Sequence, residues 1–285
     1  MIALVGQSVL DRILWPGGRI EQRLGGAPVF ASRALADAWP ALVITQGADA
    51  ELRQALHHTG LEVCEGPSER TTVYEVTLYG DGRWDESITA LGDAFTPLDV
   101  GTWMSRALAN SSAVVCGSQW RDDFPPDTLA ALAGGGRSVY LDGQGAARPR
   151  RLGPVRLDGP LDPAAVAGAH VLKLNEEEAT TLIGGINPAA PRAIGVPVVV
   201  VTLGERGAVV LADGVATEVG VEPVLGLADT VGAGDSFLAL MAAEASVGAT
   251  AVEATRRACA GVAKLLRDRL VAERLAGAPV MAADR

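Results

Sequence analysis

Cysteine, histidine and long apolar runs are scarce in this chain of 285 residues. The three cysteines are far apart and form no C-x-x-C pair, so neither a disulfide framework nor a cysteine-ligated metal site is expected. The three histidines lie near no cluster of cysteines, and we expect His57 and His58 to be a solvated pair. No apolar stretch approaches the roughly 18 residues of a membrane-spanning helix, and the N-terminus lacks the basic start of a signal peptide. These absences predict a cytoplasmic protein with reduced thiols and no membrane partner.

Basic residues are fewer than acidic ones. The 24 Lys and Arg against 34 Asp and Glu give a formal charge of −10 at pH 7. Proteins that bind nucleic acids normally present a basic surface, so no nucleic-acid partner is expected. An acidic chain can still bind an anionic nucleotide where backbone N–H groups or a metal supply the positive charge.

Two common nucleotide-binding motifs are also missing. The first apolar run is not followed by Gly-x-Gly-x-x-Gly, which argues against a dinucleotide-binding dehydrogenase. The chain has no G-x-x-x-x-G-K-[ST] segment, which argues against a P-loop NTPase. Any nucleotide site must therefore be built in another way.

What is present is an alternation of apolar, strand-like runs with helix-like segments. Hydrophobic residues make up 48% of the chain, as in a globular protein with a sizeable core. Strands are predicted over residues 2–5, 41–45, 113–116, 138–141, 171–174, 197–203 and 207–211, and helices over 29–39, 126–133, 176–183, 233–246 and 251–270. This order predicts an α/β fold with a doubly wound, mostly parallel sheet and helices on both faces.

One segment breaks this rhythm. Residues 71–86 have the pattern of strand, Gly-Asp-Gly turn and strand, which is typical of a β-hairpin. We expect a small β lid outside the main sheet, with lid elements around residues 12–24 and 70–90. No low-complexity linker divides the chain, so residues 1–285 are predicted to form a single domain. An apolar lid edge can pair with a second copy, which predicts a homodimer through the lid.

The segment 229–237 carries the strongest local chemistry. Gly232 and Gly234 flank Ala233 directly before an apolar helix, so backbone N–H groups at a positive helix terminus can form an anion hole. Asp235 lies at the same helix start. It is either a helix-capping residue or a general base that activates a substrate hydroxyl toward a phosphoryl group in the anion hole.

Two further segments follow strand ends. Asn175 and Glu178 form either a variant capping box or, at the sheet edge where ligands bind, a site that holds Mg²⁺ through water. Thr202, Gly204 and Gly207 follow the strongest strand. They belong either to an ordinary hairpin turn or to a glycine-flanked turn that a nucleotide can approach closely.

Together these segments resemble the PfkB, or ribokinase-like, carbohydrate kinase family. The D-T-x-G-A-G-D signature of that family is present without departure over residues 229–235, and its N-x-x-E and T-x-G-x-x-G elements are present over 175–178 and 202–207. A Gly-Gly pair precedes a helix at residues 25–26, and Asp11 follows the early strand. The resemblance extends over nearly the whole chain, in the expected order.

The resemblance implies a doubly wound domain with a small β lid that uses ATP and Mg²⁺ to phosphorylate a hydroxyl of a sugar or related alcohol, such as ribose, fructose or inositol. It also implies the site residues. They are the base Asp235, the anion hole of Gly232, Ala233 and Gly234, the nucleotide-binding residues Asn175, Thr202, Gly204 and Gly207, the Mg²⁺ residue Glu178, the substrate-side residues Asp11, Gly25 and Gly26, and Asp229 and Thr230 near a monovalent cation such as K⁺.

Phe30 departs from the family pattern. Ribokinases and many relatives have an asparagine at this position, four residues after the second glycine of the pair, where it contacts the sugar. Phe30 either lies against the substrate or is the first core residue of its helix. Tyr74 and its neighbours on the lid strand offer other substrate contacts. The competing functions are a nucleoside kinase and a non-catalytic nucleotide-binding protein of the same fold, and the intact Asp235 argues against the latter.

Overall fold

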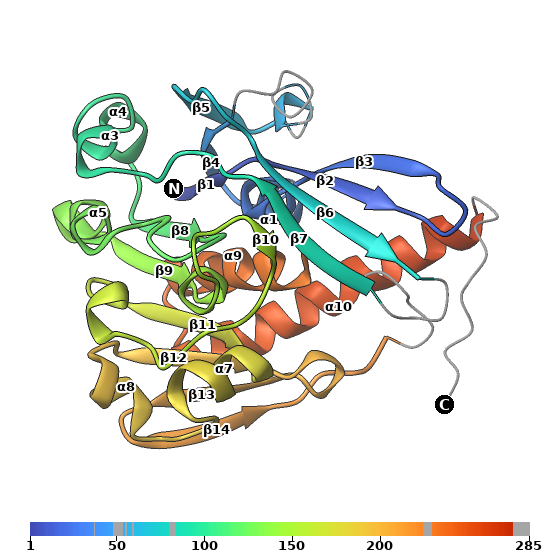
Figure 1. The fold of residues 1–285 in the computed structure, drawn as a ribbon. Coiled ribbons are helices and arrows are strands. Elements are labelled where there is room, and N and C mark those ends of the chain that lie inside the picture. The colour runs from blue at the N-terminus through green and yellow to red at the C-terminus, as the bar shows by residue number, and fades with distance from the viewer. Residues whose placement is uncertain are drawn as a thin grey trace.

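A nine-stranded sheet forms the centre of the molecule (Figure 1). The computed structural model describes the chain except for residues 37, 48–53, 55, 59, 80–83, 225–229 and 276–285. The strands of this sheet, in spatial order, are β14 (Val215–Val219), β13 (Ala208–Ala212), β12 (Val198–Thr202), β11 (Val171–Asn175), β9 (Ser138–Asp142), β8 (Ala113–Gly117), β1 (Ile2–Gln7), β4 (Ala41–Gln46) and β5 (Glu62–Gly66). All neighbours pair in parallel except β12 with β13 and β13 with β14.

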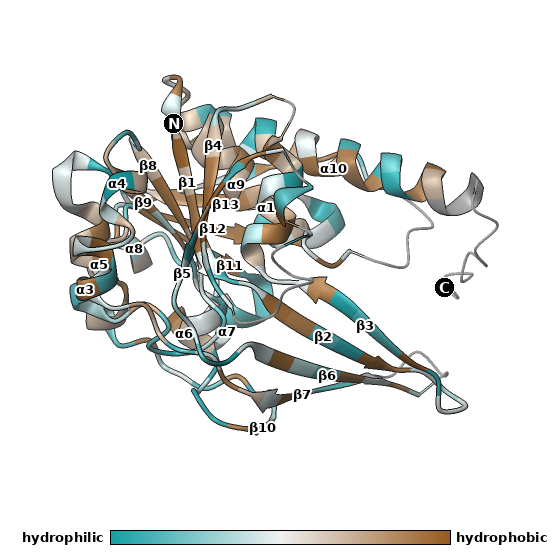
Figure 2. Cartoon of the chain, turned by 90° about the horizontal axis from the view of Figure 1, so that it is seen from above, coloured by the Kyte–Doolittle hydropathy of each residue, from teal (hydrophilic) through white to brown (hydrophobic). Residues whose placement is uncertain are grey.

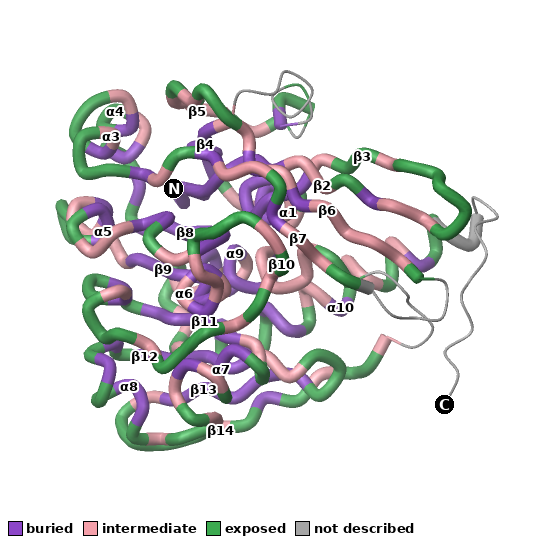
Figure 3. Tube along the Cα trace, in the orientation of Figure 1, coloured by how far each residue is buried: buried purple, intermediate pink, exposed green. Residues whose placement is uncertain are grey.

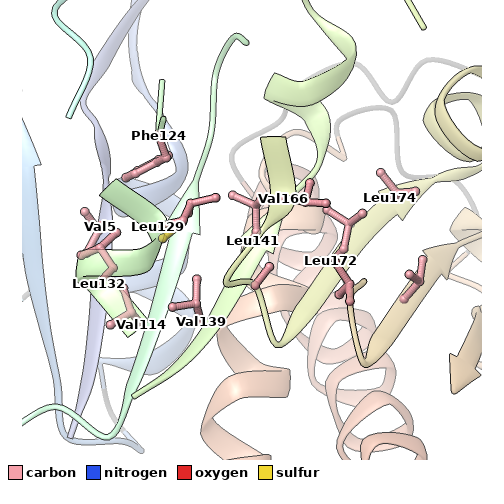
Figure 4. Packing of buried hydrophobic residues seen from close by; sticks show 14 of the residues in the cluster. Val5, Val114, Phe124, Leu129, Leu132, Val139, Leu141, Val166, Leu172 and Leu174 are labelled. Atoms are coloured by element: carbon pink, nitrogen blue, oxygen red, sulfur yellow. The ribbon is translucent and has the colours of Figure 1, made fainter. Parts of the chain in front are cut away.

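Alternate strand residues pack against helices on opposite faces of the sheet. In β1, Ala3 and Val5 belong to one buried cluster, whereas Ile2 and Leu4 belong to the other. Helices on the first face are α3 (Pro97–Gly101), α4 (Ser105–Leu108), α5 (Pro126–Ala133), α7 (Glu176–Ile183) and α8 (Ala190–Ile194), and those on the second are α1 (Ala27–Leu35), α9 (Ala233–Ser246) and α10 (Ala251–Leu275). Part of the first cluster is drawn in Figure 4. Because both faces of the sheet centre are covered, its central strands are continuous apolar runs, which Figure 2 shows in brown.

Five strands form a second sheet that projects from the main one (Figures 1 and 2). In spatial order they are β10 (Gly153–Pro154), β7 (Trp84–Ala90), β6 (Thr72–Leu78), β2 (Val9–Leu14) and β3 (Ile20–Gly25). Strands β6 and β7 pair antiparallel as a hairpin requires, and the expected Gly-Asp-Gly turn lies outside the described residues. The predicted fold class, a doubly wound sheet with a small β lid, is confirmed. The homodimer through the lid stays a prediction.

The two sheets differ in burial (Figure 3). Every residue of β1 and β4 is buried, whereas β2 and β3 are mostly half-buried or exposed. The second sheet is therefore a partly solvated layer beside a dry core.

Among the helices that the structure describes, none combines the length and the apolarity needed to cross a membrane.

Candidate active site

Helix α9 begins at the glycine-rich segment, next to the carboxyl ends of the central strands. Gly232 is the N-cap residue, with a left-handed φ of 79°, and no side chain caps the helix. The N–H of Ala233 donates to the carbonyl of Thr230 at 3.0 Å. This bond commits the Ala233 donor to the preceding turn, so the N–H groups of Gly232 and Gly234 are the better candidates for binding an anion.

Phe30 packs directly against this segment. A Cβ atom at Gly232 would lie 2.2 Å from the Phe30 ring, so glycine is needed for space as well as for its φ. The Ser236 hydroxyl also donates to the Phe30 carbonyl, at 3.5 Å. Phe30 therefore joins α1 to the start of α9. This contact supports the packing interpretation of Phe30, and its role toward a substrate stays a prediction.

A buried ion pair lies behind the glycine-rich segment at the start of α9. The Lys173 ammonium is 3.2 and 3.1 Å from the two carboxylate oxygens of Asp142, and both side chains are almost fully buried. A Cβ at Gly234 would lie only 2.8 Å from Lys173 Nζ. The sequence analysis missed both residues, although a lysine inside the apolar run 171–174 is itself a signal of a buried, paired charge.

This environment favours the protonated, neutral form of the Asp235 carboxyl. Burial raises the pKa of its carboxyl to about 7, and the charge of Asp142 acts in the same direction, while Lys173 and Arg148 oppose it. A carboxyl with a pKa near the working pH is suited to accept and release a proton. The helix-capping alternative is not what the structure shows, because no side chain caps α9.

Asn175 and Glu178 form a complete capping box at the start of α7. The Glu178 N–H donates to Asn175 Oδ1, and the Asn175 N–H donates to Glu178 Oε2, both at 2.8 Å. Glu178 is buried, and this burial raises its pKa, while Lys173 lowers it. One carboxylate oxygen of Glu178 remains outside the capping box. The capping box, one of the two interpretations of the sequence, is therefore present. It leaves one carboxylate oxygen of Glu178 for a further partner.

An open cleft of about 560 Å³ brings the second and third motifs together. Asn175, Thr202 and Gly204 line it, together with the start of α7. Gly204 has a φ of 60° with open space around its Cβ position, whereas a Cβ at Gly207 would lie 2.1 Å from the carbonyl oxygen of Val219. Gly204 thus allows a ligand to approach, but Gly207 is required by the packing of its own hairpin.

Asp11 and the glycine pair meet where the two sheets join. A Cβ at Gly25 would lie 2.4 Å from Asp11 Oδ2, and one at Gly26 would lie 2.3 Å from the Gln7 carbonyl oxygen. Burial, helped by the charge of Glu86, raises the pKa of Asp11 to about 6. The charge of Asp11 in turn raises the pKa of Asp235. The structure therefore brings Asp11 into the same site as Asp235.

Tyr74 is on the neighbouring lid strand. Its register places it beside Asp11, and its buried hydroxyl donates to the Gln119 carbonyl at 3.4 Å. Burial raises the pKa of this phenol. Tyr74 therefore supports the floor of the lid sheet, and a direct contact with a substrate stays a prediction.

The proposed monovalent cation site is only partly covered. Asp229 lies outside the described residues, and Thr230 is exposed. Across the described ranges, no group of three or more His, Cys, Asp or Glu side chains is arranged to hold a metal ion.

Comparison with known proteins supports the family suggested by the motifs. Residues 156–269 match the model of the pfkB family carbohydrate kinases. Among curated proteins, none matches this sequence.

Solved structures match nearly the whole chain. A sulfate complex of a pyrophosphate-dependent kinase in the ribokinase family has a TM-score of 0.77 and 22% identity, covering 94% of this chain and 95% of that one. Arabidopsis thaliana ribokinase complexed with ribose and ATP has a TM-score of 0.72 and 20% identity, covering 93% and 92%. Thermotoga maritima ribokinase has a TM-score of 0.71 and 19% identity, covering 92% and 91%. The predicted resemblance is confirmed: the chain has the ribokinase-like fold, and its residues 156–269 match the model of the pfkB family carbohydrate kinases.

Proposed function

We propose that this chain is a kinase that transfers the γ-phosphoryl group of ATP to a hydroxyl group of a sugar or polyol. One observation carries the proposal. Asp235, whose pKa is near 7, lies beside the glycine N–H groups at the start of α9, with Lys173 directly behind them. A base, an anion hole and a buried cation in one place are the parts that phosphoryl transfer needs.

The chemistry follows from these positions. The Asp235 carboxylate accepts the proton of the acceptor hydroxyl while its oxygen forms a bond to phosphorus. The bond from phosphorus to the leaving phosphate oxygen breaks, and ADP leaves with that electron pair. The N–H groups of Gly232 and Gly234 bind an oxygen of the transferring group, and the dipole of α9 favours its negative charge. Asp11 orients the acceptor from the side of the second sheet.

Glu178 fits a role in holding Mg²⁺ through water. Its carboxylate keeps one oxygen outside the capping box, and Asn175 lies beside it at the edge of the cleft. Mg²⁺ is commonly bound by one or two carboxylates together with waters and donor phosphates. When bound, the ion would neutralise charge on the donor phosphates. Thr230 and Asp229 remain the residues proposed near K⁺.

Pyrophosphate is a second candidate donor. Three solved structures of pyrophosphate-dependent kinases have TM-scores of 0.77, 0.76 and 0.75 with this chain, and one of them is complexed with a pyrophosphate analog and myo-inositol. Both donors present phosphates that the same anion hole can bind. Assays with ATP and with pyrophosphate, each over myo-inositol, ribose, fructose and adenosine, decide the donor and test the nucleoside alternative.

The base assignment is tested by Asp235→Asn. This change should lower kcat by roughly 10²–10⁴-fold with little change in donor KM, because general-base help is of this size. Asp127→Asn is a matched control, since Asp127 is an exposed acid in the first turn of α5. A kcat near that of wild type in Asp235→Asn would contradict the assignment.

A further inference from the structure

An ion pair that belongs to none of the sequence motifs joins the two sheets beside the base. Arg148 follows α6 (Gln144–Ala147), and Glu86 is in β7. Arg148 Nη2 lies 3.4 Å from Glu86 Oε2, and the two side chains are only 17% and 19% exposed. Arg148 also hydrogen-bonds with the side chain of Tyr74. Its guanidinium is thus held against the lid sheet.

This pair faces the space between Asp11 and Asp235. Asp11 and Tyr74 are register partners in neighbouring strands, so their side chains share one face of the second sheet. Glu86 is close enough to raise the pKa of Asp11, and Arg148 is close enough to lower the pKa of Asp235. An acceptor whose hydroxyl reaches Asp235 while Asp11 orients it would therefore lie near the Glu86–Arg148 pair.

The hydrogen bonds of Arg148 are incomplete. Its Nε–H is buried and has no acceptor among the residues that the structure describes. A buried donor without an acceptor is unfavourable, and an oxygen of a bound molecule would satisfy it. At the same time the Glu86 carboxylate occupies the end of the guanidinium. Of the Nε and Nη2 donors with which arginine can bind a phosphate through two hydrogen bonds, Nη2 is therefore already paired with the protein itself.

Charges of both signs surround this space. Asp11, Glu86 and Asp235 contribute carboxyl groups, and Arg23, Lys173 and Arg148 act on them as cations. Each of these cations is already paired with a carboxylate, Glu21, Asp142 and Glu86 in that order. An acceptor that carries a phosphate or carboxylate would meet like charges here, and a neutral polyol would not. Like charges brought together in a partly buried site oppose binding strongly.

We propose that the Glu86–Arg148 pair binds the acceptor and selects an uncharged polyhydroxyl compound over a phosphorylated or carboxylated sugar. The proposal rests on the kinase function proposed above. Arg148 offers a donor to a hydroxyl oxygen, and Glu86 both holds Arg148 in place and repels anionic acceptors.

The first test compares neutral acceptors with their phosphorylated forms on the wild-type protein. Myo-inositol, ribose and fructose are set against ribose 5-phosphate and fructose 6-phosphate, with ATP and with pyrophosphate. The best neutral acceptor should exceed every phosphorylated one in kcat/KM by on the order of 100-fold. A preference for a sugar phosphate would overturn this inference but leave the kinase function intact. Absence of transfer from either donor to any acceptor would overturn the kinase function itself.

The second test uses substitutions in the pair. Arg148→Met should raise the KM of the best neutral acceptor by roughly 10-fold or more while donor KM stays the same. Glu86→Gln should reduce the ratio of kcat/KM for the neutral acceptor to kcat/KM for the matching sugar phosphate by roughly 5-fold or more. Arg151→Met is the control, since Arg151 is an exposed neighbour in the same loop.

Calorimetric titration of that acceptor without a donor gives a readout independent of turnover. Arg148→Met should weaken this binding, whereas Arg151→Met should not. If Arg148→Met does not fold, Arg148→Lys and Glu86→Gln decide the question. Unchanged acceptor binding and unchanged discrimination in these variants would overturn the role of the pair, because a purely structural contact would alter stability and not acceptor selectivity.

Discussion

Burial raises the pKa of the Asp235 carboxyl, and two neighbours with opposite charges adjust it further. The negative charge of Asp142 raises the pKa of this carboxyl, and the positive charge of Lys173 lowers it. The transfer rate should rise as Asp235 loses its proton, that is, through about pH 7. Asp142→Asn should move this rising limb to lower pH, and Lys173→Met should move it to higher pH. The measurement is kcat/KM between about pH 5 and 9. Shifts of both variants in the same direction would refute this electrostatic account.

The same residues show what the sequence can predict at this scale. Asp235 and the glycines beside it can be proposed from the sequence because they lie within seven consecutive residues, 229–235. Glu86, Arg148 and Asp142 are not predictable in this way. Each comes from a different strand or loop, and only the fold brings them to Asp235, so no local spacing announces them.

At the scale of the helix, α7 combines a structural and a proposed chemical role in one side chain. Glu178→Gln preserves an oxygen that can accept the Asn175 N–H, so the capping box should survive and the melting temperature should change little. An amide oxygen is a weaker Mg²⁺ partner than a carboxylate, so the Mg²⁺ concentration for half-maximal rate should rise. The measurement is the transfer rate as a function of Mg²⁺ concentration, in wild type, in Glu178→Gln and in a control variant.

Glu253→Gln is the matched control. Glu253 closes an exposed capping box with Thr250 at the start of α10, far from the proposed chemistry. It should leave the Mg²⁺ titration unchanged. If Glu178→Gln also overlays wild type, Glu178 is a capping residue and no more.

The central strands of the main sheet are predictable because burial on both faces makes each of them a continuous apolar run. The observed bounds of α7 and α9 agree with the predicted ranges, since their caps and apolar spacing are local features. Helix α1 is shorter than predicted: it ends at Leu35, not at residue 39. The second sheet is harder to predict. Its β2 and β3 are half-solvated, and β2 pairs with β6, so Val9 meets Thr72, a partner that no local pattern can specify.

For the whole molecule, buried carboxyls predict a loss of stability as pH rises. Burial raises the pKa of Asp11 to about 6 and those of Asp123 and Asp235 to about 7, from an ordinary value of 3.8. Between these values the folded chain holds protons that the unfolded chain has released, so the free energy of unfolding falls as pH increases. The half-buried Glu21 and the exposed Glu253 have lowered pKa values, and their opposing contribution is confined to pH values around and below the ordinary value of 4.5.

Urea unfolding at several pH values between about 5 and 8 measures this slope. Asp123→Asn should flatten it, because Asp123 is fully buried and binds the Gln7 amide and the Gln119 N–H. The exposed Asp127→Asn should leave the slope as in wild type. A free energy of unfolding that is constant or rising over this interval would show that these carboxyls stay ionised in the folded protein.

The passage of β1 into β2 through Ser8 alone has a mechanical consequence. Ser8 is fixed by its N–H to the Gln46 carbonyl at 3.1 Å and by its hydroxyl to that of Thr45 at 2.8 Å, so the second sheet is attached without slack. Strand β2 then acts as a lever: its six residues extend about 20 Å, at roughly 3.3 Å each. A rotation of about 10° at this pivot would carry its far end by about 3.5 Å, more than the length of a hydrogen bond. A substrate held by one or two hydrogen bonds near β2 could thus set the position of the whole second sheet. The hydrogen bonds between the strands of that sheet would stay intact.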